Sequence, residues 1–94
     1  MKLFGPTASR VEKWISDRKV KKLVETLGCE DGALRRRAAE GMAEIRSAEV
    51  LQYCSDNAQN PDKDVRWHIT QILGLIGTPP AMRILANVRP PKKE

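Results

Sequence analysis

Apolar residues recur along this chain at the spacing of amphipathic helices, and two of the predicted helices are copies of each other. Residues 34–45 (LRRRAAEGMAEI) and residues 65–76 (VRWHITQILGLI) align at an offset of 31 residues. An aspartate stands three residues before each copy, at Asp31 and Asp62. A fixed offset in this range is typical of repeat proteins, in which each unit buries its apolar face against its neighbours.

The same offset links the shorter helices that the pattern predicts between the copies. Val20 and Leu51 are 31 residues apart, and so are Leu51 and Met82. Ser9, followed by Glu12, has the spacing of a capping box and predicts a short helix over about residues 9–15. No segment alternates with period two, so no strand is expected. Helix boundaries are predicted near Gly28, Asp31, Ser47, Pro61 and Gly77.

These elements predict an all-α fold, a short α-solenoid (α-α superhelix) of about two and a half helix pairs with a short N-terminal helix. Residues 1–17 are expected to form an N-terminal arm and a capping helix. Residues 18–88 form the repeat domain, and residues 89–94 form a flexible tail.

Composition adds little about the partner of this fold. The net charge is +5, which favours an acidic partner but is also ordinary for a soluble protein. No apolar run approaches the length of a membrane span, so no membrane association is expected. Cys29 and Cys54 have no metal-binding spacing; Cys54 is expected in the core and Cys29 in a loop. The absence of a disulfide framework predicts a reducing, cytoplasmic location.

The repeated pattern resembles HEAT repeats of the short variety found in the bilin-lyase (phycobilisome lyase) family, over about residues 18–88. The residues that carry the resemblance are Leu23, Leu27, Asp31, Leu34, Arg35, Ala38, Met42 and Ile45, with Asp62, Val65, Arg66, Ile69, Leu73 and Ile76 in the second copy. The resemblance implies a helical solenoid, with the aspartates and arginines as structural residues.

Those structural residues are also i, i+4 pairs, Asp31 with Arg35 and Asp62 with Arg66. In each pair the acid lies nearer the helix N-terminus, an order that suits both ion pairing and the helix dipole. The sequence therefore predicts two structural ion pairs, with the further option that each arginine reaches the aspartate of the neighbouring repeat.

A partner-binding face is predicted on the side of the duplicated helices that points away from their apolar stripe. Its candidate residues are Arg36, Arg37, Glu40, Trp67, His68 and Gln71. In HEAT-like solenoids the second helices line the concave surface, and an aromatic residue beside arginines is typical of interface hot spots. The alternative is that Trp67 packs over Ala39 and Ala43 and fills the groove between repeats.

The favoured function is a non-enzymatic protein-protein interaction or scaffold module. The alternative is binding of a nucleic-acid backbone through the basic surplus, although glutamates interrupt any continuous basic track. A lyase-like activity is implied only by family analogy. Some HEAT-like enzymes carry His-Glu metal dyads, but the only histidine, His68, is followed by Ile69. No catalytic, cofactor or metal residues are therefore predicted.

The end of the repeat array predicts a second contact surface. The apolar residues of the last helix spread around more than one side, which leaves a strip without a covering helix: Met82, Ile84, Leu85 and Val88. Exposed strips of this kind mark association sites. We expect self-association through residues 80–88 or docking of a partner there, the alternative being that the tail from Arg89 folds back over the strip.

Overall fold

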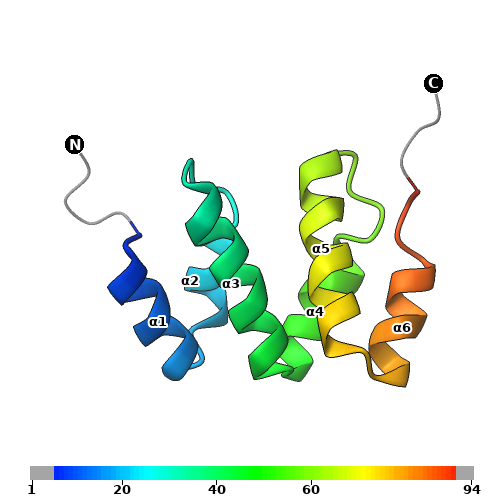
Figure 1. Cartoon of the computed structure of the whole chain (residues 1–94). Helices are drawn as coiled ribbons and strands as arrows, with labels where there is room; N and C mark the ends of the chain where they lie inside the picture. The colour runs from blue at the N-terminus through cyan, green and yellow to red at the C-terminus, as the bar shows by residue number, and fades with distance from the viewer. Residues whose placement is uncertain (1–5, 91–94) are drawn as a thin grey trace.

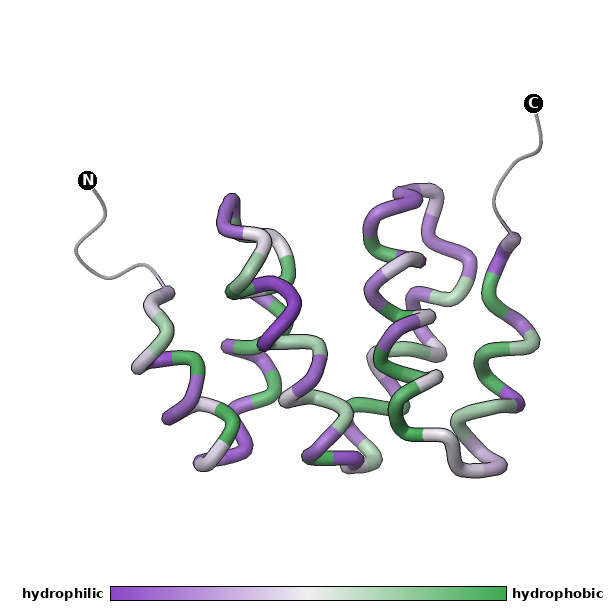
Figure 2. Tube along the Cα trace, viewed as in Figure 1, coloured by the Kyte–Doolittle hydropathy of each residue, from purple (hydrophilic) through white to green (hydrophobic). Residues whose placement is uncertain are grey.

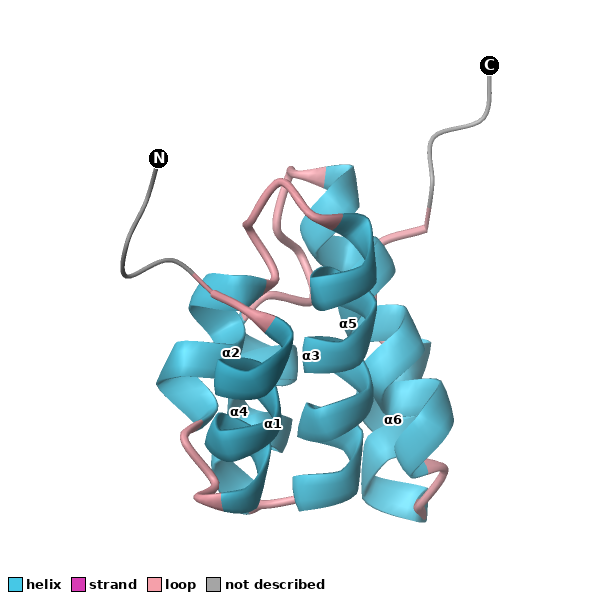
Figure 3. Ribbon diagram, turned by 60° about the vertical axis from the view of Figure 1, so that its left-hand side comes forward, coloured by secondary structure: helices cyan, strands magenta, loops and turns pink. Residues whose placement is uncertain are grey.

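The computed structural model describes residues 6–90, and within them it has helices and loops but no strand (Figure 3). The helices are α1 (Ala8–Ser16), α2 (Val20–Thr26), α3 (Gly32–Ile45), α4 (Ala48–Asp56), α5 (Lys63–Ile76) and α6 (Pro79–Ala86). The all-α prediction is confirmed, and so are the predicted boundaries in the repeat region.

The helices form a short solenoid of stacked pairs. α1, α3 and α5 lie side by side, with α2 and α4 behind them (Figure 1). The pairs α2–α3 and α4–α5 are the two full units, and α6 is the first helix of a third. The longest dimension is 39 Å and the shortest 17 Å, as expected for a slab two helices thick.

The loops begin and end the helices with recognisable caps. The side chains of Asp31, Ser47 and Asp62 each accept a backbone N–H at the start of α3, α4 and α5. Gly77 ends α5 in the left-handed conformation, as expected for a helix C-terminus. The predicted cap of the first helix is wrong. Thr7, rather than Ser9, accepts the N–H of Arg10, because the N-cap lies two residues earlier than the capping-box pattern indicates.

The N-terminal helix α1 has the register of a second helix. Val11 lies 31 residues before Met42, which lies 31 residues before Leu73, and all three side chains are fully buried. α1 packs against both α2 and α3, as α3 packs in turn against α5. The structure therefore contains three second helices rather than two, and the N-terminal helix is part of the repeat pattern.

One continuous core runs between the helices. Apolar residues alternate with polar ones along each helix (Figure 2), and the apolar ones turn inward. Cys54 is fully buried in this core, as predicted, whereas Cys29 is half-buried in the loop before α3. Gly41 of α3 allows close contact with α1, because a Cβ atom there would overlap Ile15.

The chain after α6 turns along the loop between α4 and α5. The N–H of Arg89 donates to the carbonyl oxygen of Ala58 at 2.9 Å, and Gln59 Nε2 donates to the carbonyl oxygen of Asn87 at 2.6 Å. The rest of the predicted flexible tail, residues 91–94, lies outside the described residues, as do residues 1–5 of the predicted arm. Among the helices that are described, none has the length and apolar character needed to span a bilayer.

Candidate binding groove between α3 and α5

The predicted Asp–Arg ion pairs are replaced by two other sets of contacts. Asp31 Oδ1 accepts the N–H groups of Ala33 and Leu34, because a carboxylate at the N-cap can satisfy the free donors of the helix start. Arg35 Nη1 instead donates to the carbonyl oxygen of Cys29 at 2.7 Å. The expectation of an i, i+4 pair was therefore wrong for this copy.

The second copy repeats these contacts. Asp62 Oδ1 accepts the N–H of Asp64 at 2.8 Å, and Arg66 Nη1 donates to the carbonyl oxygen of Asn60 at 2.6 Å. Each aspartate caps its helix, and each arginine forms a hydrogen bond to the loop carbonyl oxygen six residues before it. All four residues make contacts within their own repeat unit, but the aspartates and arginines do not pair with each other.

Arg37, a predicted partner-binding residue, is engaged within the protein. Its guanidinium donates to both carboxylate oxygens of Glu12 on α1, and its Nη1 also lies 2.8 Å from Glu44 and 3.4 Å from Glu40. These contacts raise the pKa of Arg37 and lower that of Glu12, chiefly through their hydrogen bonds to each other. Arg37 thus joins α1 to α3 and lies apart from the Trp67 surface.

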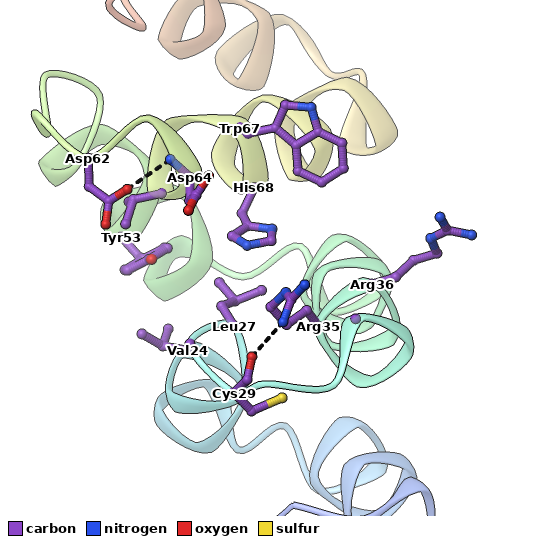
Figure 4. A pocket seen from close by; sticks show the side chains of 13 residues that line it. Val24, Leu27, Cys29, Arg35, Arg36, Tyr53, Asp62, Asp64, Trp67 and His68 are labelled. Carbon is purple, nitrogen blue, oxygen red and sulfur yellow. Dashed lines mark hydrogen bonds between the residues drawn. The ribbon is translucent and has the colours of Figure 1, made fainter.

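The other candidates line a groove between α3 and α5. At the loop end of the groove is a cleft of about 770 Å³, bordered by both duplicated helices (Figure 4). Further along the helices is a hollow of about 340 Å³. Arg36 borders both spaces, and the two together are called the α3–α5 groove below. Its charged, polar and exposed lining includes Arg35, Arg36, Glu40, Asp62, Asp64, Trp67, His68, Gln71 and Leu75.

Apolar side chains from three helices form part of the cleft lining. Val24 and Leu27 come from α2 and its C-cap, Val65 comes from α5, and Tyr53 comes from α4. Figure 4 shows His68 directed from α5 toward Arg35 and Leu27, between these walls. The cleft therefore combines apolar side chains with charged and polar ones, and a polar ring is directed into it.

Trp67 is exposed on the rim of this groove. Its exposed fraction is 58%, and the ring meets that of His68 edge-on at 5.6 Å between centroids. Ala39 and Ala43 are buried, whereas Trp67 is largely exposed and is not packed into a groove over them. The structure therefore favours the first of the two sequence-based alternatives, a solvent-facing Trp67. Leu75, two turns further along α5, is also 58% exposed.

His68 and Gln71 each have a buried polar atom in the groove. His68 is only 8% exposed, and its Nδ1 has no hydrogen-bond partner among residues 6–90. Gln71 Oε1 is likewise buried and unpaired. Desolvation by burial lowers the pKa of His68, and the nearby Arg35 charge lowers it further. His68 is thus held in its neutral form, with one ring nitrogen available as an acceptor.

The last helix, α6, shows how the predicted contact surface at residues 80–88 is built. Val20 is 4% exposed in the first unit, whereas Met82, its equivalent in the third, is 45% exposed. Leu85 is half-buried where its equivalents Leu23 and Cys54 are fully buried. The difference arises because α3 and α5 cover those earlier positions. Self-association through residues 80–88 stays a prediction, with Met82 as its most exposed apolar residue.

Comparison with known proteins identifies the repeat type. The family model described as HEAT repeats matches residues 20–90, which include both full helix pairs and α6. Comparisons with curated proteins and with solved structures give no match. Within the described residues, no three His, Cys, Asp or Glu side chains come together as a metal site would require. The matched segment covers most of the chain and both copies of the pattern, so the protein belongs to the HEAT repeat family.

Proposed function

We propose that this protein is a non-enzymatic binding module that holds a partner protein in the α3–α5 groove. The observation that carries the proposal is Trp67, a large aromatic side chain exposed at the rim of a groove that apolar side chains line in part. Exposing such a ring to water is unfavourable unless a partner covers it, and tryptophan is among the residues most enriched at interface hot spots.

The charges of the groove support a protein partner over a nucleic acid. Of the three consecutive arginines, Arg35 binds a loop carbonyl and Arg37 binds three glutamates, so only Arg36 presents its charge freely to the groove. Asp62 and Asp64 border the same cleft. A phosphate backbone needs a row of unopposed cations, and the groove does not offer one. The basic surplus of the chain therefore does not favour an acidic partner at this site.

Other parts of the assignment remain predictions. HEAT repeats generally mediate protein-protein interaction, and this general role supports a scaffold or adaptor rather than a lyase. The resemblance to the bilin-lyase variety rests on the short, 31-residue unit. A cytoplasmic location is supported by the two free thiols, which a reducing compartment would maintain.

Affinity purification with quantitative mass spectrometry tests the proposal. The tagged wild-type chain is compared with Trp67→Ala and with Met82→Ala, a matched control in which an exposed apolar side chain outside the groove is removed. Loss of a hot-spot tryptophan costs about 2 kcal/mol or more, so recovery of the partner should fall roughly 30-fold. Met82→Ala should recover it normally, and both variants should keep the wild-type melting temperature.

The decisive comparison is between the two variants. If a partner is recovered equally by wild type and Trp67→Ala, the groove is not its binding site. If Met82→Ala alone loses the partner, binding occurs at the open end of the array, and the α3–α5 assignment is wrong.

A further inference from the structure

The two interfaces between successive second helices occupy the same register but have opposite chemistry. At the α1–α3 interface Arg37 is surrounded by three glutamates, Glu12, Glu40 and Glu44. The residues 31 positions later form the corresponding part of the α3–α5 interface: His68 in place of Arg37, Ala43 in place of Glu12, Gln71 in place of Glu40 and Leu75 in place of Glu44. The first interface therefore has a network of ion pairs between its helices, and the corresponding residues of the second interface are neutral and form no such network.

This substitution removes from the second interface the cross-helix carboxylate that the first interface has. In the first interface, Glu12 reaches across from the preceding helix and satisfies Arg37. In the second, the residue that corresponds to Glu12 is Ala43, whose methyl group can neither donate nor accept a hydrogen bond. His68 Nδ1 and Gln71 Oε1 have no partner within residues 6–90. Both atoms therefore remain available to hydrogen-bonding groups from outside residues 6–90.

Resting on the proposed function, we propose that the occupant of the α3–α5 groove is an extended, weakly charged peptide segment of the partner. Its backbone supplies the hydrogen bonds that His68 and Gln71 lack, and its apolar side chains contact Trp67 and Leu75. Both unpaired atoms belong to planar end groups with a soft final torsion, so a small rotation turns each toward the occupant.

An extended chain fits these requirements better than a helix. The backbone groups of a helix are already bonded to one another, whereas an extended segment presents free N–H and C=O groups along its edge. His68 and Leu75 are separated by seven residues of α5, or about 10 Å along its axis. A stretch of about three extended residues spans that distance.

The charges of the groove fix the electrostatic character of the segment. Arg35 and Arg36 face Asp62, Asp64 and Glu40, and these opposite charges nearly cancel along the groove. Neither a strongly acidic nor a strongly basic segment gains from such a lining, because each would meet like charges as well as opposite ones. Apolar contacts at Trp67 and Leu75, both 58% exposed, would then provide most of the attraction.

A displayed library of random heptapeptides, selected on the full chain, provides the probe. Enriched peptides are synthesised and their affinities measured by fluorescence polarisation against wild type, the His68→Leu/Gln71→Leu double variant and Trp67→Ala. Gln52→Leu on α4 is the matched control, because Gln52 is exposed and lies outside the groove. The double variant should fold, since each substitution removes an unpaired buried polar atom.

We expect enriched peptides to be rich in apolar residues and to bind the double variant about tenfold more weakly than wild type and Gln52→Leu. N-methylation of the peptide backbone should lower affinity for wild type by a similar factor, but should change affinity for the double variant much less. A smaller effect of N-methylation on the double variant than on wild type would indicate that His68 and Gln71 bind the peptide backbone. Loss of packing alone would not produce this difference.

Each contrary outcome has a separate meaning. Peptides that bind wild type and the double variant equally, but lose affinity for Trp67→Ala, would overturn the backbone contacts and leave the proposed function standing. An affinity unchanged by all groove variants would overturn both. Failure to enrich any peptide, together with salt-sensitive binding of a 20-nucleotide single-stranded DNA that Trp67→Ala abolishes, would assign the groove to nucleic acid instead.

Discussion

Gly41 of α3 lies so close to Ile15 of α1 that a Cβ atom on the glycine would overlap the isoleucine side chain. Ile15 is branched at Cβ and therefore has little freedom to move aside. Gly41→Ala should destabilise the protein by about 1–3 kcal/mol, because the overlap forces α1 away from α3. Urea denaturation measures the change.

Gly74 provides the matched control for this prediction. It also lies within a helix, but a Cβ atom there would meet nothing within 4 Å. Gly74→Ala should therefore stabilise the protein by about 0.5–1 kcal/mol through the lower backbone entropy of the unfolded chain. If the two substitutions have the same sign, close contact at Gly41 does not determine the packing of α1.

Leu73 and Leu75 test which side of α5 faces the core. Leu73 is fully buried and Leu75 is 58% exposed, although they are only two residues apart. Leu73→Ala should cost about 2–5 kcal/mol as a buried large-to-small change. Leu75→Ala should change stability by less than about 0.5 kcal/mol. Similar values for both variants would show that the register of α5 is misassigned.

Arg46 and Gly77 occupy equivalent positions 31 residues apart, and both have positive φ, 52° and 67°. A left-handed conformation is costly for a residue with a Cβ atom and costs glycine little. Arg46→Gly should therefore stabilise the protein by up to about 1 kcal/mol, and Gly77→Ala should destabilise it by a similar amount. Thermal denaturation of both variants checks the prediction, which a destabilised Arg46→Gly would contradict.

His68 makes stability depend on pH in a predictable direction. Burial and Arg35 lower its pKa from the ordinary value of 6.5, while Asp62 and Asp64 oppose the shift. As pH falls below 6.5 the unfolded chain takes up the proton first, so the contribution of neutral His68 is lost as pH drops through the lower folded value. Urea denaturation at pH 7.5 and 5.5 should show a larger loss for wild type than for His68→Leu. Equal losses would contradict the prediction.

The two cysteines should differ in reactivity. Burial raises the pKa of Cys54 to about 12, so its reactive thiolate is scarce as well as inaccessible. Cys29 is half-buried in a loop, where its thiol donates to the carbonyl oxygen of Asp31 at 3.5 Å. A colorimetric thiol reagent should modify Cys29 in the native protein and Cys54 only after unfolding. Rapid modification of both in native buffer would show that α4 opens readily.

The sequence predicts the repeat architecture because apolar spacing and helix caps are local. Asp31, Asp62 and Gly77 lie at the ends that the pattern indicates, and each acts on backbone groups within a few residues. The partners of Arg35 and Arg37 were missed because they depend on how loops and neighbouring helices approach in space. The 31-residue offset from Val11 to Met42 is a sequence signal for the register of α1.

The candidate site was predictable in part for the same reason. Helical periodicity places Trp67, Gln71 and Arg36 on the outer side of their helices, and all three border the groove. It cannot show that His68 Nδ1 lacks a partner within residues 6–90, because that depends on the side chains that the neighbouring helices bring near it. Comparing equivalent positions in the α1–α3 and α3–α5 interfaces, rather than residues within one helix, shows that charged residues in the first are replaced by neutral ones in the second.

The loop contacts of Arg35 and Arg66 have a consequence for how the array can change in length. Each guanidinium binds a carbonyl only six residues earlier, so the loop of each unit is fastened from within that unit. A copied or deleted 31-residue segment would include both the arginine and the carbonyl group of its own loop contact. The loop contacts of the neighbouring units would be unchanged. Length can therefore vary by whole units at small energetic cost, and the groove chemistry of each new junction is free to diverge separately.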